Sequence, residues 1–150
     1  MRPTFLAILS CLLAAACGPS IQRMALQDDA NAKAFPQPTP SLAAVYIYRG
    51  GNYAPHWPVN IKLLGDHVQT PLPVGTFVRA EVPAGLTEVS CITNALPDRQ
   101  RLDLQPDQTR YFRVTINAGD WGPFCLVDEV PAAEGQAAVL RAQRIPPLYP

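Results

Sequence analysis

The chain has few lysines and no excess of charge of either sign. Only two of its twelve basic residues are lysines, and twelve acidic residues balance them, so the formal net charge is zero. Nucleic-acid-binding domains carry a basic face or a basic run, and this sequence has neither. The sequence therefore predicts no nucleic-acid partner.

Patterns typical of catalytic and metal sites are also lacking. The two histidines, His56 and His67, have no cysteine pair at C-x-x-C spacing beside them, and Ser90 lies outside a G-x-S-x-G turn. Asp128 and Glu129 are neighbours in an expected strand, where successive side chains point to opposite faces rather than into one cleft. We assign no catalytic residue, metal ligand or cofactor, and we expect a protein that is not an enzyme.

No apolar run reaches the length of a permanent membrane helix, which needs about twenty residues. A shorter run opens the chain: residues 4–16 are uncharged and mostly apolar, and they follow Arg2. A basic start, a short apolar centre and small residues at its end are typical of a secretory signal. Residues 1–16 are therefore predicted to be a signal peptide.

The end of this segment, residues 13–17 (LAAAC), resembles the lipobox of bacterial lipoproteins, in which small residues precede an acceptor cysteine. The resemblance implies cleavage before Cys17 and lipidation of Cys17, whose acyl chains anchor the protein stably to a membrane. Gly18 stands where an aspartate would signal retention in the inner membrane, so the periplasmic face of the outer membrane is the expected location. Two alternatives remain open: a soluble protein cut near Ala16, and cleavage before Cys11.

Residues 17–41 are predicted to be a tether between the anchor and the domain. The prolines of residues 36–40 (PQPTP) favour an extended, polyproline-like path of roughly 3.1 Å per residue. Residues 21–33 allow a weak helix, but the sequence DDAN at 28–31 leaves it without an apolar face. The segment is either a tether of useful reach or a linker of no consequence.

Residues 42–145 alternate short apolar runs with turn residues, which is typical of a β domain. In the first run, Val45 and Ile47 would share one face and Tyr46 and Tyr48 the other. The expected strands are residues 43–49, 59–64, 67–72, 76–82, 86–93, 99–104, 109–117 and 124–130. Seven or eight short strands at this spacing predict an all-β antiparallel sandwich. A short helix within residues 132–144 is expected to pack across an open edge or end, and residues 146–150 form a tail.

Several motifs in this domain resemble a family of bacterial lipoproteins. The motifs are AVYIYR at 44–49, LGD at 64–66, LPVGTF at 72–77, VPAG at 82–85 and LVDE at 126–129. The family carries a periplasmic domain of unknown function that is similar to PEGA domains and to other Ig-like, prealbumin-like or carboxypeptidase-regulatory-like β-sandwiches. The resemblance implies a fold and a compartment, and it carries no chemistry.

The four cysteines divide into two groups. Cys11 leaves with the signal and Cys17 is lipidated, which leaves Cys91 and Cys125, each in an expected strand. In an oxidising compartment two such cysteines are expected to form a disulfide. The alternative is a pair of buried free thiols.

Aromatic and imidazole side chains gather in residues 50–58, where Tyr53, His56 and Trp57 lie within five positions, and Trp121 occupies a later turn. Exposed aromatic residues are enriched at binding surfaces, and a flat indole ring can stack on a sugar. These four are the candidate binding residues, with the alternative that the rings cap the core.

These features favour a non-enzymatic interaction or structural module of the cell envelope. Its partners would be the membrane, through the lipid anchor, and another envelope protein; the alternative function is a carbohydrate- or peptidoglycan-binding β-sandwich. Arginines spread over the strands are expected to be solubilising charges rather than an anion site: Arg49, Arg79, Arg110 and Arg113.

Overall fold

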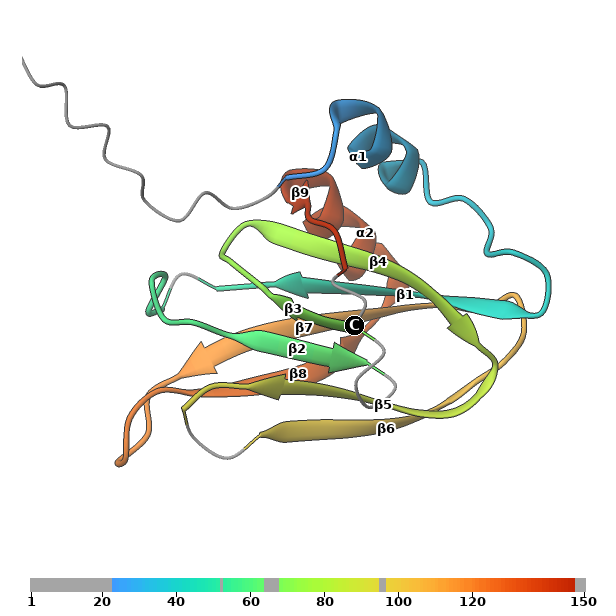
Figure 1. Ribbon diagram of the computed structural model, residues 1–150. Helices are drawn as coiled ribbons and strands as arrows, with labels where there is room; N and C mark the ends of the chain where they lie inside the picture. The colour runs from blue at the N-terminus through green and yellow to red at the C-terminus, as the bar shows by residue number, and fades with distance from the viewer. Residues whose placement is uncertain (1–22, 52, 64–67, 95–96, 148–150) are drawn as a thin grey trace, which may run out of the picture.

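Strands provide most of the regular structure in the computed structural model, which describes residues 23–51, 53–63, 68–94 and 97–147 (Figure 1). Within these ranges the elements are α1 (Leu26–Lys33), β1 (Leu42–Arg49), β2 (Asn60–Leu63), β3 (Val68–Pro71), β4 (Thr76–Pro83), β5 (Gly85–Ile92), β6 (Asp98–Leu104), β7 (Thr109–Asn117), β8 (Phe124–Val130), α2 (Ala132–Arg141) and β9 (Gln143–Arg144). Each expected strand from the sequence has a counterpart that begins and ends within a few residues of it.

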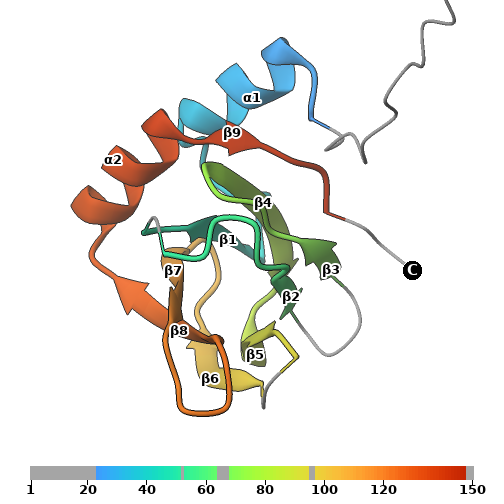
Figure 2. The ribbon, with the colours of Figure 1, turned by 90° about the vertical axis from the view of Figure 1, so that its left-hand side faces the viewer.

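The strands form two sheets that pack face to face. One has five strands in the order β8-β7-β1-β4-β9, and the other has four in the order β3-β2-β5-β6. Both helices lie on the outer face of the five-stranded sheet, so that the molecule has three layers (Figure 2). The prediction of two packed sheets of short strands with a helix near the C-terminus is confirmed.

Two strand pairs are parallel, so the expectation of a wholly antiparallel sandwich is wrong on this point. β1 pairs antiparallel with β4 on one side and parallel with β7 on the other, where Ile47 lies opposite Phe112. β9 pairs with β4, again in parallel. The physical reason is that the alternation of apolar and polar residues shows only which face of the sheet a side chain lies on. Whether two neighbouring strands are parallel depends on the connection between them, which the alternation does not reveal.

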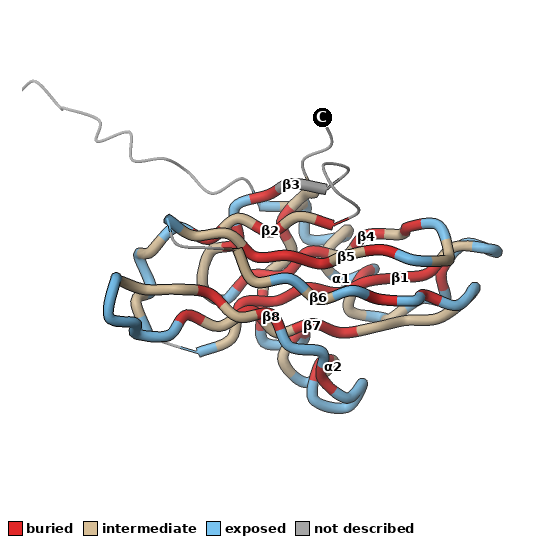
Figure 3. The backbone as a smooth tube through the Cα atoms, turned by 90° about the horizontal axis from the view of Figure 1, so that it is seen from below, coloured by how far each residue is buried: buried red, intermediate tan, exposed pale blue. Residues whose placement is uncertain are grey.

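An aliphatic core fills the space between the two sheets. Val45 and Ile47 of β1 point into it, as their spacing predicted, together with Ile61 of the facing sheet and Phe112 of β7. Figure 3 shows the buried stretches concentrated in the central strands, with exposed residues at the loops. The outer face of β6 stays in water, and burial along that strand alternates accordingly. This core follows the period of two that the sequence displays.

A second core, rich in aromatic rings, lies between the five-stranded sheet and the helices. The rings of Tyr46 and Tyr111 stack with centroids 5.1 Å apart, and Phe77 lies 6.2 Å from Tyr46. The Tyr46 hydroxyl donates a hydrogen bond to the Ala32 carbonyl at 2.8 Å and accepts one from Arg79 Nε at 3.1 Å. β1 is therefore buried on both faces, which explains why seven consecutive residues of it are buried.

Residues 24–40, which the sequence predicts as part of the tether, lie against the domain instead. The backbone N–H of Arg144 donates to Asp29 Oδ1 of α1 at 2.7 Å. Ala32 is buried in the aromatic core, and Phe35 packs at its border. The helix has no apolar stripe, as expected, but a small residue and a few polar contacts are enough to dock it. What remains of the predicted tether is residues 17–23, most of which lie outside the described residues.

α2 is the helix that the sequence predicts near the C-terminus, but it covers a face of the sheet rather than an edge or end. Gly135 makes this approach possible, because a Cβ atom built there would lie 2.4 Å from Cβ of Tyr111. Glycine lowers helix propensity, and here it permits close packing of helix on sheet. The chain then pairs briefly with β4, where the Ile145 N–H donates to the Phe77 carbonyl at 2.9 Å.

Candidate functional site

The turn between β7 and β8 carries the most exposed large apolar side chain of the described residues. Trp121 has a relative exposure of 101%, as open as a side chain in an extended peptide. The turn is closed by a hydrogen bond from the Gly122 N–H to the Gly119 carbonyl at 3.1 Å. Beside it is a hollow of about 920 Å³, which we call the Trp121 hollow, lined by Asn94, Pro97, Asp98, Asp120, Trp121 and Phe124 among others.

The strands beside the Trp121 hollow are cross-linked. The predicted disulfide between Cys91 and Cys125 is confirmed, with Cα atoms 6.1 Å apart, and it joins β5 of one sheet to β8 of the other. Asp98 Oδ2 accepts a hydrogen bond from the backbone N–H of Val127 at 2.8 Å, which ties β6 to β8 nearby. These links fix the positions of the strands that carry the lining residues.

A buried arginine organises the loop that follows β1. Arg49 has a relative exposure of 6%, so the expectation of a solubilising charge is wrong for this residue. Its guanidinium donates to the carbonyls of Ala54 at 2.9 Å, Trp57 at 3.0 Å and Leu72 at 3.2 Å. Burial lowers the pKa of Arg49, and among the described residues only carbonyl oxygens pair with it.

The three candidate residues of this loop have different environments. Tyr53 is exposed, with a relative exposure of 53%, and His56 is exposed as well. Trp57 is half-buried, and its indole Nε1 is buried without a hydrogen-bond partner among the described residues. His56 and Trp57 line a small pocket of about 140 Å³ with Pro55. The exposure of Tyr53 and Trp121 does not fit the alternative in which these rings cap the core.

The two aromatic loops emerge at the same end of the molecule but do not form one site. β1 and β7 run in parallel, so the loops that follow them leave the five-stranded sheet in the same direction. Trp121 lines the hollow described above, whereas His56 and Trp57 line the smaller pocket. None of the pockets described here is lined by both loops.

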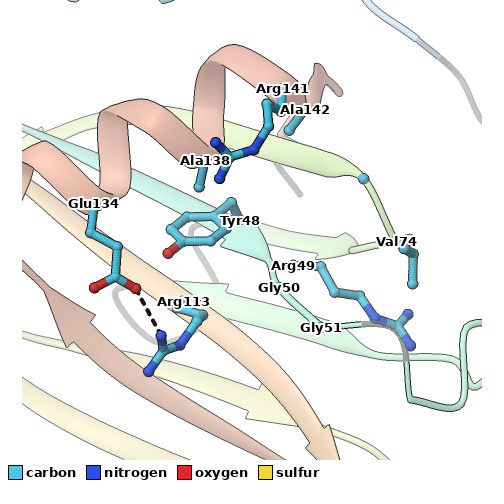
Figure 4. A pocket seen from close by; sticks show the side chains of 11 residues that line it. Tyr48, Arg49, Gly50, Gly51, Val74, Arg113, Glu134, Ala138, Arg141 and Ala142 are labelled. Carbon is cyan, nitrogen blue, oxygen red and sulfur yellow. Dashed lines mark hydrogen bonds and ion pairs between the residues drawn. The ribbon is translucent and has the colours of Figure 1, made fainter.

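A third pocket, of about 340 Å³, lies between α2 and the ends of β1 and β7 (Figure 4). We call it the arginine pocket, because its lining includes Tyr48, Arg49, Arg113, Glu134 and Arg141. In the sequence the charged residues of this pocket are far apart. The packing of α2 over β7 brings Arg113, Glu134 and Arg141 together. The nearest signal in the sequence is the glycine pair that follows Arg49, which marks the end of a strand.

The charged side chains of the arginine pocket change the pKa of Tyr48. Burial raises the pKa of Tyr48, with Glu134 adding to the effect and Arg113 and Arg141 opposing it. Arg113 Nη1 donates to Glu134 Oε1 at 2.8 Å. In Figure 4 the Tyr48 hydroxyl points towards the place where Arg113 and Glu134 meet, and Arg141 reaches down from α2 above the ring. The pocket therefore presents several hydrogen-bond donors within one small volume.

The other strand arginines that the sequence analysis expected to be solubilising charges, Arg79, Arg110 and Arg113, take part in ion pairs. Arg79 Nη2 lies 2.6 Å from Glu81 Oε1, and Arg110 pairs with Glu129. Asp128 is 3.7 Å from Arg113, so the two neighbouring acids of β8 have separate arginine partners. The acids are not a pair directed at one cleft, in agreement with their expected strand geometry. The arginines link strands and helices rather than serving solubility alone.

The described residues show neither a metal-binding cluster nor a membrane-spanning helix. No group of three His, Cys, Asp or Glu side chains in the described part of the chain is placed to hold a metal ion. Within that part, neither helix has the length and apolar character needed to cross a membrane. The predicted signal peptide, the lipidation site Cys17 and His67 lie outside the described residues.

Comparisons with known proteins return no relative. No protein-family model matches the chain, and neither a curated protein nor a solved structure does. Its function is therefore inferred from its own residues and geometry.

Proposed function

We propose that this protein is a lipid-anchored, non-enzymatic interaction module of a bacterial cell envelope, which contacts an envelope protein through the Trp121 hollow. The exposure of Trp121 is the observation that carries the proposal. The indole ring of Trp121 exposes a large apolar surface to water, and burying that surface would be favourable. Tryptophan is also enriched among the residues that contribute most to binding free energy at protein interfaces. A partner that covers the ring would gain that energy.

The surroundings of Trp121 support a binding role. The hollow beside it offers both an apolar wall, from Phe124, and polar groups, from Asn94 and Asp98. Because the disulfide and the Asp98 contact hold the strands in place, little ordering would be needed when a partner binds. An aromatic anchor beside a polar rim is the usual composition of a protein interface.

The location in the envelope is part of the proposal. The lipobox resemblance at residues 13–17 supports an anchor on Cys17, and Gly18 supports the periplasmic face of the outer membrane. A disulfide between Cys91 and Cys125 is consistent with an oxidising compartment. We expect Cys17→Ser to release the protein from the membrane fraction and Cys11→Ser to leave it there. Release by both variants, or by neither, would contradict an anchor on Cys17.

We also propose that the domain is related to PEGA-like and other Ig-like or prealbumin-like sandwiches. Two of the motifs that carry the resemblance coincide with turns: LPVGTF leads into β4, and VPAG joins β4 to β5. Gly75 and Gly85 in these motifs have φ of 71° and 117°, which favours glycine. This supports a shared pattern of strands and turns.

Site-specific crosslinking tests the interaction. A photo-crosslinking residue at position 121 is expected to give a defined protein adduct in cells, whereas the same residue at position 86 is not. Leu86 is the matched control, because it is also exposed, at 85%, but does not line the Trp121 hollow. Adducts at both positions, or at position 86 alone, would contradict a site at Trp121.

A second candidate, binding of carbohydrate or peptidoglycan, is favoured by the flat ring of Trp121 beside the carboxylates of Asp98 and Asp120. Such groups accept hydrogen bonds from sugar hydroxyls while the ring stacks on the sugar face. The test is retention of the purified protein on isolated cell wall. Retention that is lost in Trp121→Ala but kept in Leu86→Ala would favour this candidate over a protein partner.

A further inference from the structure

We propose that the arginine pocket is a second binding site, separate from the Trp121 hollow, and that it takes the carboxylate group of a ligand. At about 340 Å³ the pocket is large enough for the end of a small molecule or of a peptide chain. It is formed by four parts of the chain that are distant in sequence: the end of β1, the turn before β4, Arg113 of β7, and α2 with Arg141. The proposal does not rest on the function proposed for Trp121.

The charges that line this pocket are unbalanced. Two arginines, Arg113 and Arg141, face a single acid, Glu134, since the guanidinium of Arg49 points away from them in Figure 4. Asp128 contacts Arg113 at 3.7 Å without lining the pocket, so Arg113 has two acidic neighbours, whereas Arg141 has no acidic partner among the described residues. The guanidinium of Arg49 is held by the carbonyls of Ala54, Trp57 and Leu72 and is not available to a ligand in this pocket. An anion in the pocket would supply the acidic partner that Arg141 lacks.

Hydrogen-bond donors in the pocket are left over after the contacts within the protein are counted. Arg141 makes no hydrogen bond or ion pair with any described residue, although it is close enough to influence Tyr48. Arg113 Nε is buried and has no hydrogen-bond partner among the described residues, while its side chain keeps 38% of its surface exposed. An unsatisfied buried donor is costly, and an acceptor supplied by a ligand would offset that cost.

The geometry favours a carboxylate over a phosphate. A guanidinium presents a planar fork of N–H donors that matches the two oxygens of a carboxylate. Glu134 stays in the pocket and repels a second negative charge, which disfavours a dianion. The Tyr48 hydroxyl is hydrogen-bonded to Glu134, so the donors left for a ligand are those of Arg141 and Arg113.

The test compares two probes that differ in charge alone. N-acetylalanine carries a free carboxylate, and N-acetylalaninamide has the same shape without the charge. In two-dimensional NMR spectra of the protein, N-acetylalanine is expected to shift the Nε–Hε signals of Arg113 and Arg141 and the amide signals of Gly50 and Gly51 in a saturable way. Equal shifts with the amide would overturn the proposal, and so would tighter binding of inorganic phosphate than of N-acetylalanine.

Variants locate the site. Arg141→Gln removes a side chain without a described partner, so the fold is expected to persist, and the affinity for N-acetylalanine is expected to fall about tenfold, as for loss of one charge-assisted hydrogen bond. Arg99→Gln is the control, because Arg99 is an exposed arginine on β6 of the other sheet. An unchanged affinity in Arg141→Gln, or an equal loss in both variants, would overturn the assignment.

Trp121→Ala separates the two sites. This change is expected to leave the response to N-acetylalanine intact, because Trp121 does not line the arginine pocket. Loss of the response in Trp121→Ala would overturn the proposal of an independent site.

Discussion

The two faces of the five-stranded sheet are both buried, yet they are held in different ways. The face towards the other sheet is covered by aliphatic side chains and by a disulfide. The face towards the helices is covered by aromatic rings, and hydrogen bonds and ion pairs attach the segments above it. Asp29 and Arg144, which join α1 to β9, are 115 residues apart in sequence.

The two faces should therefore differ in how their stability depends on pH and salt. Aliphatic burial and a covalent bond depend little on pH or salt, whereas hydrogen bonds and ion pairs near the surface depend on both. We therefore expect changes on the face between the sheets to affect the whole fold. Changes on the helix face are expected to act more locally and to cost less unfolding free energy.

Removing the disulfide should have the largest effect. The double variant Cys91→Ala/Cys125→Ala is expected to lose about 3–4 kcal/mol of unfolding free energy, because the bond closes a loop of 34 residues in the unfolded chain. Urea unfolding measures the loss, and the native protein in reductant should show a similar value. A loss under about 1 kcal/mol would indicate that the aliphatic core holds the sheets together without the covalent link.

Gly135→Ala tests the packing of α2. Alanine favours helix by about 1 kcal/mol over glycine, but its Cβ would lie 2.4 Å from Tyr111 and force the helix away from β7. We expect a net destabilisation of about 2 kcal/mol, as for overpacking in a core. Ala137→Gly, at an exposed position of the same helix, is the control and should cost about 1 kcal/mol through propensity alone. Stabilisation by Gly135→Ala would contradict the close approach of helix and sheet.

Tyr46→Phe tests the hydrogen bonds under α1. The change keeps the ring but removes the donor to the Ala32 carbonyl and the acceptor for Arg79. We expect a loss of about 1–2 kcal/mol, with faster hydrogen exchange confined to residues 24–35. Tyr53→Phe, on an exposed ring, should change neither quantity. Uniformly faster exchange throughout the molecule would mean that α1 does not open separately.

The smallest effect is expected at Glu81. Burial alone would raise the pKa of Glu81, but hydrogen bonds from Thr39 and Arg79 and the charge of Arg79 outweigh it and hold the pKa below its usual range. Because the pKa is lower in the folded state, this contribution is present above the unfolded pKa, about 4.3, and is lost as the pH falls through the folded pKa.

Glu81→Gln should therefore reduce stability by less than about 1 kcal/mol at pH 7, with the difference shrinking below about pH 4. Urea unfolding at several pH values measures it. Glu88→Gln is the control, because its pair with Arg99 is longer, at 3.6 Å, and more exposed. A difference between Glu81→Gln and the native protein that is independent of pH would contradict the shifted pKa.

The sequence predicts the face between the sheets well and the helix face poorly. Val45 and Ile47 show the period of two that burial against a second sheet requires, and the turn residues mark where each strand ends. The same period also places Tyr46 and Tyr48 together on the other face. It does not reveal that α1 and α2 cover them, because α1 has no apolar stripe.

Some features of the candidate sites could be predicted from the sequence, and others could not. Trp121 and the disulfide are visible in the sequence, because an aromatic residue in a glycine turn and two cysteines in strands are local signals. The sequence does not reveal that Trp121 and Trp57 line separate pockets. Nor does it reveal the arginine pocket, since Arg113 and Arg141 come together only when α2 crosses β7.

The positions of the strands, the cysteine pair and the faces of β1 can therefore be predicted from the amino-acid sequence, because each depends on short-range alternation or on chemistry at a single residue. The parallel pairing of β1 with β7, the docking of α1 and the grouping of arginines around Tyr48 are set by contacts in the folded protein. These features depend on contacts between segments that are far apart in the sequence. The free energy that stabilises them therefore cannot be read from any short stretch of the sequence.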